Sequence, residues 1–184
     1  MKVIEAIWSR KSSREYQKRE ISQKNLMSLI DAARLAPSGN NAQPTKYFIV
    51  EDEETKTILK ENKVFPQDFV YDASAIIVVL SDSEIYTKNK KGLDSNNDLR
   101  AIRDSSIASA FLTLRATELG LSTCYIGWMR RTKLKELLNI PAHYLLPFVI
   151  SVGYSKENAK TNIKKNRKSM DDILLSKNFP KHSE

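Results

Sequence analysis

The sequence predicts a single α+β domain over residues 1–184, and three observations support this prediction. A chain of 184 residues can bury most of its apolar surface in one core, and 41% hydrophobic with 28% charged residues is ordinary globular usage. Short apolar runs typical of strands are separated by segments with helical spacing. Strands and helices do not alternate strictly, so a layered α+β fold is favoured over a doubly wound dinucleotide-binding sheet.

Apolar residues at helical spacing predict about five helices. The first begins at Val3 and ends near Ser9 to Ser12, in a polar turn. The second covers 23–35, with Ser22 as its N-cap and Pro37 as its stop. The remaining helices are expected over Glu53–Glu61, over Asn97–Leu119 with Gly120 at its C-terminal end, and after Thr132 as a cap.

Four apolar runs predict strands, at Tyr47–Val50, Ala75–Leu80, Leu121–Trp128 and Phe148–Val152. The second run is apolar throughout, which predicts a strand buried on both faces. The segment from Ser81 to Asn97 has no apolar period. We therefore expect a mobile surface loop there, of the kind that often covers an active site.

The net charge of +8 is concentrated at the two ends of the chain. Residues 1–24 hold seven Lys and Arg against three Asp and Glu, and residues 154–184 hold eight against four. The middle of the chain balances, with fifteen of each sign. Nucleic-acid-binding proteins usually spread basic residues along one face and interleave aromatic ones, so no nucleic-acid partner is expected. If the termini meet, they form one compact anion site.

Several other classes of protein are disfavoured. No apolar run approaches the roughly 20 residues of a membrane span, and the N-terminus does not read as a secretory signal, so we expect no membrane partner and a cytoplasmic location. One cysteine and two histidines exclude a disulfide framework and a zinc cluster. Cys124 is expected to be a buried hydrophobe and His143 a structural residue. Phosphate-loop, dinucleotide-binding and nucleophile-elbow motifs do not occur.

Four short segments remain as candidates for chemistry. Ser9–Arg14 offers three cations and three hydroxyls to a phosphate, although a solvated turn is an alternative. Ala36–Pro44 gathers Ser and amide side chains between two prolines, suited to a flat heterocycle and its polyol. In Cys124–Trp128 a glycine can admit a planar ligand or mark a bulge. Lys165-Asn-Arg167 can bind the same phosphate from the other side.

In order and spacing, these segments resemble the nitroreductase family of flavin enzymes, and the resemblance spans nearly the whole chain. The matching segments are Arg10-Lys-Ser-Ser-Arg14, Ala36-Pro-Ser-Gly-Asn-Asn-Ala-Gln-Pro44, Leu119-Gly-Leu-Ser-Thr-Cys-Tyr-Ile-Gly127 and Lys165-Asn-Arg167. The resemblance implies a homodimer with a mostly antiparallel central sheet flanked by helices. It also implies two FMN sites at the interface, each built from both chains.

The resemblance assigns roles to individual residues. The FMN phosphate and ribityl chain would be held by Arg10, Ser12, Arg14, Lys165 and Arg167. Lys11 replaces a family arginine with a less directional donor and would act through its backbone or at the flavin edge. The second subunit would place Pro37, Ser38, Asn41 and Gln43 over or beside the isoalloxazine, and Ile126 and Gly127 would lie against another part of the ring.

The activity implied by the resemblance is a two-step, ping-pong exchange. NADH or NADPH delivers hydride to FMN and leaves, and an oxidised acceptor such as a nitroaromatic, a quinone or a flavin is then reduced in the same space. The chemistry belongs to FMN, so neither a catalytic acid–base residue nor a metal is expected. Reductive deiodination and destruction of FMN, known in relatives, rank below this activity. An FMN storage or sensing protein without turnover is the alternative, and a small basic nucleic-acid binder is the weakest hypothesis.

Overall fold

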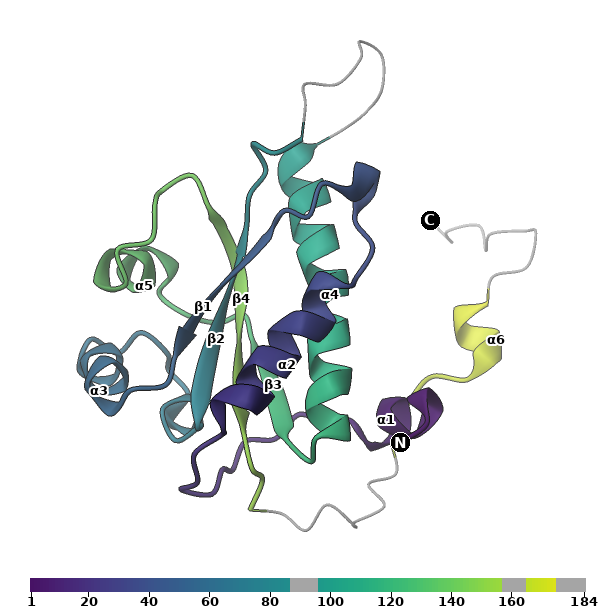
Figure 1. The fold of residues 1–184 in the computed structure, drawn as a ribbon, viewed down its shortest axis with the longest axis horizontal. Helices are drawn as coiled ribbons and strands as arrows, with labels where there is room; N and C mark the ends of the chain where they lie inside the picture. Colours follow the sequence, from purple (N-terminus) through teal and green to yellow (C-terminus); the bar gives the residue numbers. More distant parts are fainter. Residues whose placement is uncertain (87–95, 157–164, 175–184) are drawn as a thin grey trace, which may run out of the picture.

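A central sheet lies between two layers of helices (Figure 1). The structure is a computed structural model that describes residues 1–86, 96–156 and 165–174. The sheet has the strand order β1-β2-β4-β3, and each pair of neighbours is antiparallel. Its strands are β1 (Thr45–Val50), β2 (Ala75–Ser81), β3 (Ser122–Ile126) and β4 (Leu145–Gly153). The predicted α+β class with an antiparallel sheet is confirmed.

The helices are divided between the two faces of the sheet. On one face lie α2 (Gln23–Arg34) and the long α4 (Asn97–Glu118), and on the other lie α3 (Glu53–Glu61) and α5 (Arg131–Leu137) (Figure 1). The short α1 (Val3–Ser9) lies beside one end of α4, and α6 (Met170–Ile173) extends beyond it (Figure 1). Two single-turn 3₁₀ helices complete the described elements, η1 (Gly39–Asn41) and η2 (Asp68–Val70).

Strand β2 is buried along its whole length, as its uninterrupted apolar sequence predicts. Its alternate side chains enter two hydrophobic clusters. Ile77 and Val79 pack with residues of α2 and α4, whereas Ile76 and Val78 pack with residues of α3 and α5. This one strand therefore connects both halves of the core. Full burial of each such side chain contributes about 1.5–3 kcal/mol to the stability of the fold.

Local signals placed most element boundaries within a few residues. The hydroxyl of Ser22 caps α2 by accepting a hydrogen bond from the Asn25 N–H, and α3 has its predicted bounds. Gly120 has a φ of 73° and ends α4, with its N–H and that of Leu121 donating to the carbonyls of Thr117 and Ala116. Because the Leu121 N–H is used by the helix end, β3 begins one residue later than predicted.

Two local predictions were wrong. Helix α5 is not capped by Thr132: it begins at Arg131, and its position is set by the Arg130 N–H, which donates to the Val64 carbonyl at 2.9 Å. A surface loop was expected from Ser81 onward, yet Ser81 belongs to β2 and Tyr86 is only 4% exposed. Residues 87–95 of that predicted loop lie outside the described part of the chain.

Helix α1 shows its apolar side chains to solvent in the single chain. Ala6 is its one buried residue, whereas Val3 is 72% exposed and Trp8 is 67% exposed. Such a face usually marks a contact with another protein or a membrane. No helix within the described ranges is both long and apolar enough to cross a bilayer.

Candidate functional site

The segment that carries Arg10 to Arg14 is fixed to the free edge of β3. The Ser13 N–H donates to the Thr123 carbonyl at 3.0 Å, and Ser12 forms a bridge to Thr123 in the parallel sense. Tyr16 then anchors the segment in the core: its hydroxyl contacts the Ser151 hydroxyl at 2.8 Å and donates to backbone carbonyls, and burial raises its pKa. The polar turn after α1 is therefore joined to the sheet by one bridge and by the anchored Tyr16, while Ser12 and Arg14 remain exposed.

Gly153 makes room for this anchor, which yields a stability prediction. A Cβ at position 153 would lie 2.7 Å from the Tyr16 ring and 3.2 Å from the Ser74 backbone nitrogen. Overpacking of this kind costs about 1–3 kcal/mol, so Gly153→Ala is expected to lower the unfolding free energy by that amount in urea denaturation. Gly127→Ala is the matched control, because a Cβ there meets nothing within 4 Å. Equal stabilities of the two variants would contradict the prediction.

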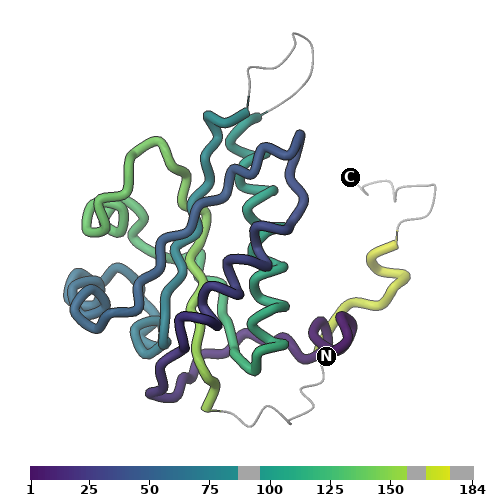
Figure 2. Tube along the Cα trace, viewed as in Figure 1, coloured from purple at the N-terminus to yellow at the C-terminus, as the bar shows by residue number. Residues whose placement is uncertain are grey.

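The two ends of the described chain meet beside α1. The Lys165 Nζ donates to the Ile7 carbonyl at 2.6 Å, and the segment 165–174 passes alongside α1 in the Cα trace (Figure 2). The pKa of Lys165 is lowered by partial burial and by the positive charges of Arg10 and Arg167. Arg10 and Arg14 also act electrostatically on Cys124, whose pKa is nonetheless raised because the thiol is buried. These contacts define a terminal cation cluster, consisting of Arg10, Arg14, Lys165 and Arg167.

The composition of the terminal cation cluster fits a phosphate group. Among the residues that the structure describes, no carboxylate forms an ion pair with any of its four cations. Like charges repel one another unless an anion compensates them. Guanidinium groups, an ammonium group and the nearby Ser12 hydroxyl are the donors that bind phosphate oxygens most strongly. The residues present therefore match the phosphate end of FMN. Lys11, half-buried between Arg10 and Ser12, lies on the same segment.

Ile126 and Gly127 form the exposed end of β3. The Ile126 side chain is 3% exposed and packs in the core, so only its backbone can face a ligand. Gly127 is exposed, has open space where a Cβ would be, and lies outside the paired register, so it is not a bulge. An open backbone position at a strand end is suited to the face of a planar molecule.

Arg131, which the sequence analysis did not single out, fixes the strand end. Its guanidinium donates to the carbonyls of Gly127 at 2.7 Å, Leu146 at 3.0 Å and Pro147 at 3.1 Å. One side chain thus joins the end of β3 to the start of β4. No local sequence signal announces this role, because it depends on three carbonyls that only the folded chain brings together.

The amide-rich segment forms a strained loop at the end of α2. Asn40, Asn41 and Gln43 all have positive φ values, of 54°, 53° and 51°. Such values are uncommon outside glycine, especially for Gln, and they occur often at ligand-binding sites. The Ser38 hydroxyl accepts a hydrogen bond from the Gln43 N–H at 2.9 Å and holds the turn closed. Pro37, Asn41 and Gln43 remain exposed.

A buried carboxylate supports this loop, and the sequence analysis also missed it. Asp104 of α4 is 2% exposed and accepts hydrogen bonds from the Gly39 N–H and the Tyr86 hydroxyl, each at 2.6 Å, and from Arg103 at 2.9 Å. One sequence signal could have identified Asp104: it lies four residues before Ala108 and therefore on the same buried face of α4. Charged side chains are rarely buried unless they are paired.

Within one chain the phosphate-binding candidates and the amide loop form two separate groups. The loop that contains η1 lies at the upper end of α4 in Figure 1, whereas α1 and the start of the segment 165–174 lie near its lower end. The structure thus brings the phosphate-binding candidates together and leaves Pro37, Ser38, Asn41 and Gln43 apart from them. It shows no group of His, Cys, Asp and Glu able to hold a metal within the ranges described.

Comparisons with known proteins show which family the chain resembles. Residues 7–64 and 56–154 match the model of the nitroreductase family. A candidate NADH dehydrogenase/NAD(P)H nitroreductase of Archaeoglobus fulgidus is 33% identical over 84% of this chain and 86% of its own length. An FMN reductase [NAD(P)H] of Bacillus subtilis is 28% identical over 79% of this chain and 62% of its own. The crystal structure of a nitroreductase family protein from Clostridium difficile superposes with a TM-score of 0.81 at 25% identity, over 97% of this chain and all of that one.

Proposed function

The chain belongs to the nitroreductase family and is an NAD(P)H-dependent oxidoreductase that uses FMN, and we propose that it works by a two-step exchange. In this exchange bound FMN takes up hydride from NADH or NADPH, the nicotinamide leaves, and an oxidised acceptor such as a nitroaromatic, a quinone or a flavin is reduced in the same space. The observation that most directly supports FMN binding in this proposal is the terminal cation cluster, which lacks a carboxylate partner among the described residues.

The chain's own residues supply binding and orientation. Arg10, Arg14, Lys165 and Arg167 hold the phosphate, with the Ser12 hydroxyl beside them. Lys11 contributes from the same edge segment, through its backbone or at the flavin edge. Because Tyr16 and the bridge to Thr123 fix that segment to the sheet, the donors are organised before the cofactor arrives.

The amide loop acts in a homodimer, in which each subunit is one domain over residues 1–184 and completes its partner's site. Pro37, Ser38, Asn41 and Gln43 of one copy lie over or beside the ring held by the other. The separation of this loop from the terminal cation cluster in one chain supports the arrangement (Figure 1). The exposed apolar face of α1, with Val3 and Trp8, is a surface that a second copy can cover.

The end of β3 positions the reacting face. Gly127 leaves its backbone open to the ring, and Arg131 holds that backbone in place through the Gly127 carbonyl. Ile126 contributes its backbone only, because its side chain belongs to the core. No side chain is required as acid or base, since the protein's part is to stack, orient and restrict access.

The visible spectrum of freshly purified protein tests the function. We expect a flavin absorption band that bleaches after anaerobic addition of NADH or NADPH, and that returns when a quinone or a nitroaromatic is added. Comparing the two donors at equal concentration gives the nucleotide preference. A flavin band that neither donor bleaches would instead support FMN storage or sensing. A colourless protein that does not take up FMN would refute the proposal.

A further inference from the structure

A cavity of about 430 Å³ begins at the residue that follows Gly127. Its walls include three aromatic side chains, Phe65, Tyr71 and Trp128. The rings of Phe65 and Tyr71 lie 5.6 Å apart, and the Tyr71 hydroxyl accepts a hydrogen bond from the Phe65 N–H at 2.8 Å. These two rings are fixed in the core, where Phe65 is 2% and Tyr71 7% exposed, whereas Trp128 is 74% exposed. A large exposed indole beside a fixed aromatic wall is suited to stacking against a flat ring.

Three cations line the same cavity, Lys60, Lys63 and Arg130, against one carboxylate, that of Asp68. The Lys60 Nζ lies 5.9 Å from the centre of the Tyr71 ring. In the described part of the chain none of the three cations forms an ion pair with a carboxylate. The cavity therefore combines one exposed indole ring with an excess of positive charge.

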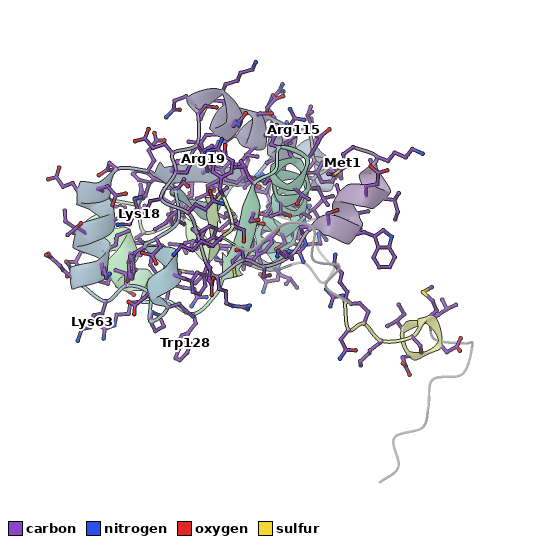
Figure 3. All side chains as sticks on the ribbon, turned by 90° about the horizontal axis from the view of Figure 1, so that it is seen from below. Met1, Lys18, Arg19, Lys63, Arg115 and Trp128 are labelled. Atoms are coloured by element: carbon purple, nitrogen blue, oxygen red, sulfur yellow. The ribbon has the colours of Figure 1, made fainter. Side chains whose placement is uncertain are left out.

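Lys63 occupies a backbone position that normally favours glycine. Its φ is 49°, and it follows the C-terminal end of α3, where its N–H and that of Val64 donate to the carbonyls of Lys60 and Leu59. This is the helix-ending turn that most often carries glycine. Strained non-glycine residues cluster at functional sites. Lys63 and Trp128 project from the same edge of the molecule (Figure 3).

We propose that this cavity is a subsite for the electron acceptor and that it selects planar aromatic anions, an inference that rests on the proposed function. Trp128 stacks on the acceptor's ring, and Lys63 and Arg130 bind its anionic group. Because Trp128 directly follows Gly127 in the chain, the cavity adjoins the strand end that is proposed to face FMN. For a nitroaromatic, the net reaction converts the nitro compound, NAD(P)H and one proton into the nitroso compound, NAD(P)⁺ and water.

Direct binding tests the subsite without turnover. Equilibrium dialysis of 4-nitrobenzoate and neutral 4-nitrobenzamide is carried out against the oxidised FMN-containing protein, with no NAD(P)H present. We expect the anion to bind about tenfold more tightly than the amide, as one good charge-assisted contact provides. Lys63→Gly and Arg130→Gln should each remove most of this preference, whereas Trp128→Ala should weaken both compounds alike.

The variants separate loss of the subsite from loss of the fold. Lys63→Gly is expected to keep or raise the melting temperature, because glycine prefers the backbone conformation at position 63. Lys24→Ala, which removes an exposed lysine from α2, is the matched control and should bind both compounds like the unchanged protein. Unchanged preference for the anion in both Lys63→Gly and Arg130→Gln would overturn the inference.

Steady-state kinetics then connect the subsite to the reaction. The ratio of kcat/KM for 4-nitrobenzoate to that for 4-nitrobenzamide should fall about fivefold to tenfold in Lys63→Gly and stay constant in Lys24→Ala. A constant ratio in Lys63→Gly would overturn the acceptor role. If no acceptor supports NAD(P)H oxidation at all, the proposed function fails, and the dialysis result still decides whether the cavity selects aromatic anions.

Discussion

Replacing Arg14 and Arg167 together by alanine is expected to leave the purified protein with little bound FMN. The two guanidinium groups come from opposite ends of the chain. Arg14 and Arg10 both act on the Cys124 thiol, and Arg10 and Arg167 both act on Lys165, so the positive charges of the two ends lie close together. Each charge-assisted hydrogen bond to a phosphate contributes about 1.5–3 kcal/mol. Losing two of them is expected to weaken FMN binding by about 100-fold to 10,000-fold. The flavin-to-protein ratio after purification and a flavin titration of the apoprotein measure the effect.

A control with equal loss of charge makes this result specific. Lys24→Ala with Lys133→Ala also removes two positive charges, from α2 and α5, and should retain the FMN content of the unchanged protein. Far-ultraviolet circular dichroism should show the same helix and strand content in both double variants. Stoichiometric FMN in the Arg14→Ala, Arg167→Ala protein would refute the assignment of the terminal cation cluster to the phosphate.

Most of the fold could be predicted from the sequence because local signals coincide with the tertiary structure. The apolar run of β2 predicts a strand buried on both faces, and each of its faces meets a separate layer of helices. Ser22 and Gly120 mark the ends of their helices through hydrogen bonds that involve only neighbouring residues. The prediction that Thr132 caps α5 was wrong because the start of α5 is positioned by a distant partner, the Val64 carbonyl, which accepts a hydrogen bond from the Arg130 N–H.

The charge pattern left open whether the two basic termini meet, and the family resemblance placed Arg10, Arg14, Lys165 and Arg167 in one site; the structure brings these cations close together. The supporting residues of the candidate site could not be predicted. Asp104 acts through Gly39, which is 65 positions away, and Arg131 acts through carbonyls of two strands. Trp128 and Lys63 come together through the packing of the α3 end against the segment after β3. Contacts of this kind depend on tertiary geometry and leave no periodic or motif signal in one sequence.

Asp104→Asn is expected to lower the unfolding free energy by about 2 kcal/mol and the melting temperature by about 6 °C at neutral pH. In the unchanged protein the charged Asp104 carboxylate accepts three hydrogen bonds, from Gly39, Tyr86 and Arg103. A neutral amide has only one oxygen acceptor and cannot accept all three equally well. Because Gly39 begins the strained turn, FMN affinity should also fall. Arg103→Gln removes only the exposed partner and should change stability by less than about 1 kcal/mol.

Acidification gives the same substitution a second test. Burial raises the pKa of Asp104, but hydrogen bonds from Tyr86, Gly39 and Arg103 outweigh it, so the net shift is downward. A carboxyl whose pKa is lower in the folded state stabilises the protein above its unfolded value, about 3.9, and loses that contribution as the pH falls further. The stability difference between the unchanged protein and Asp104→Asn should therefore be constant from about pH 7 to 5 and shrink below about pH 4. A difference in urea unfolding free energy that grows on acidification would show that the Asp104 charge is unfavourable and that its hydrogen bonds do not hold the loop.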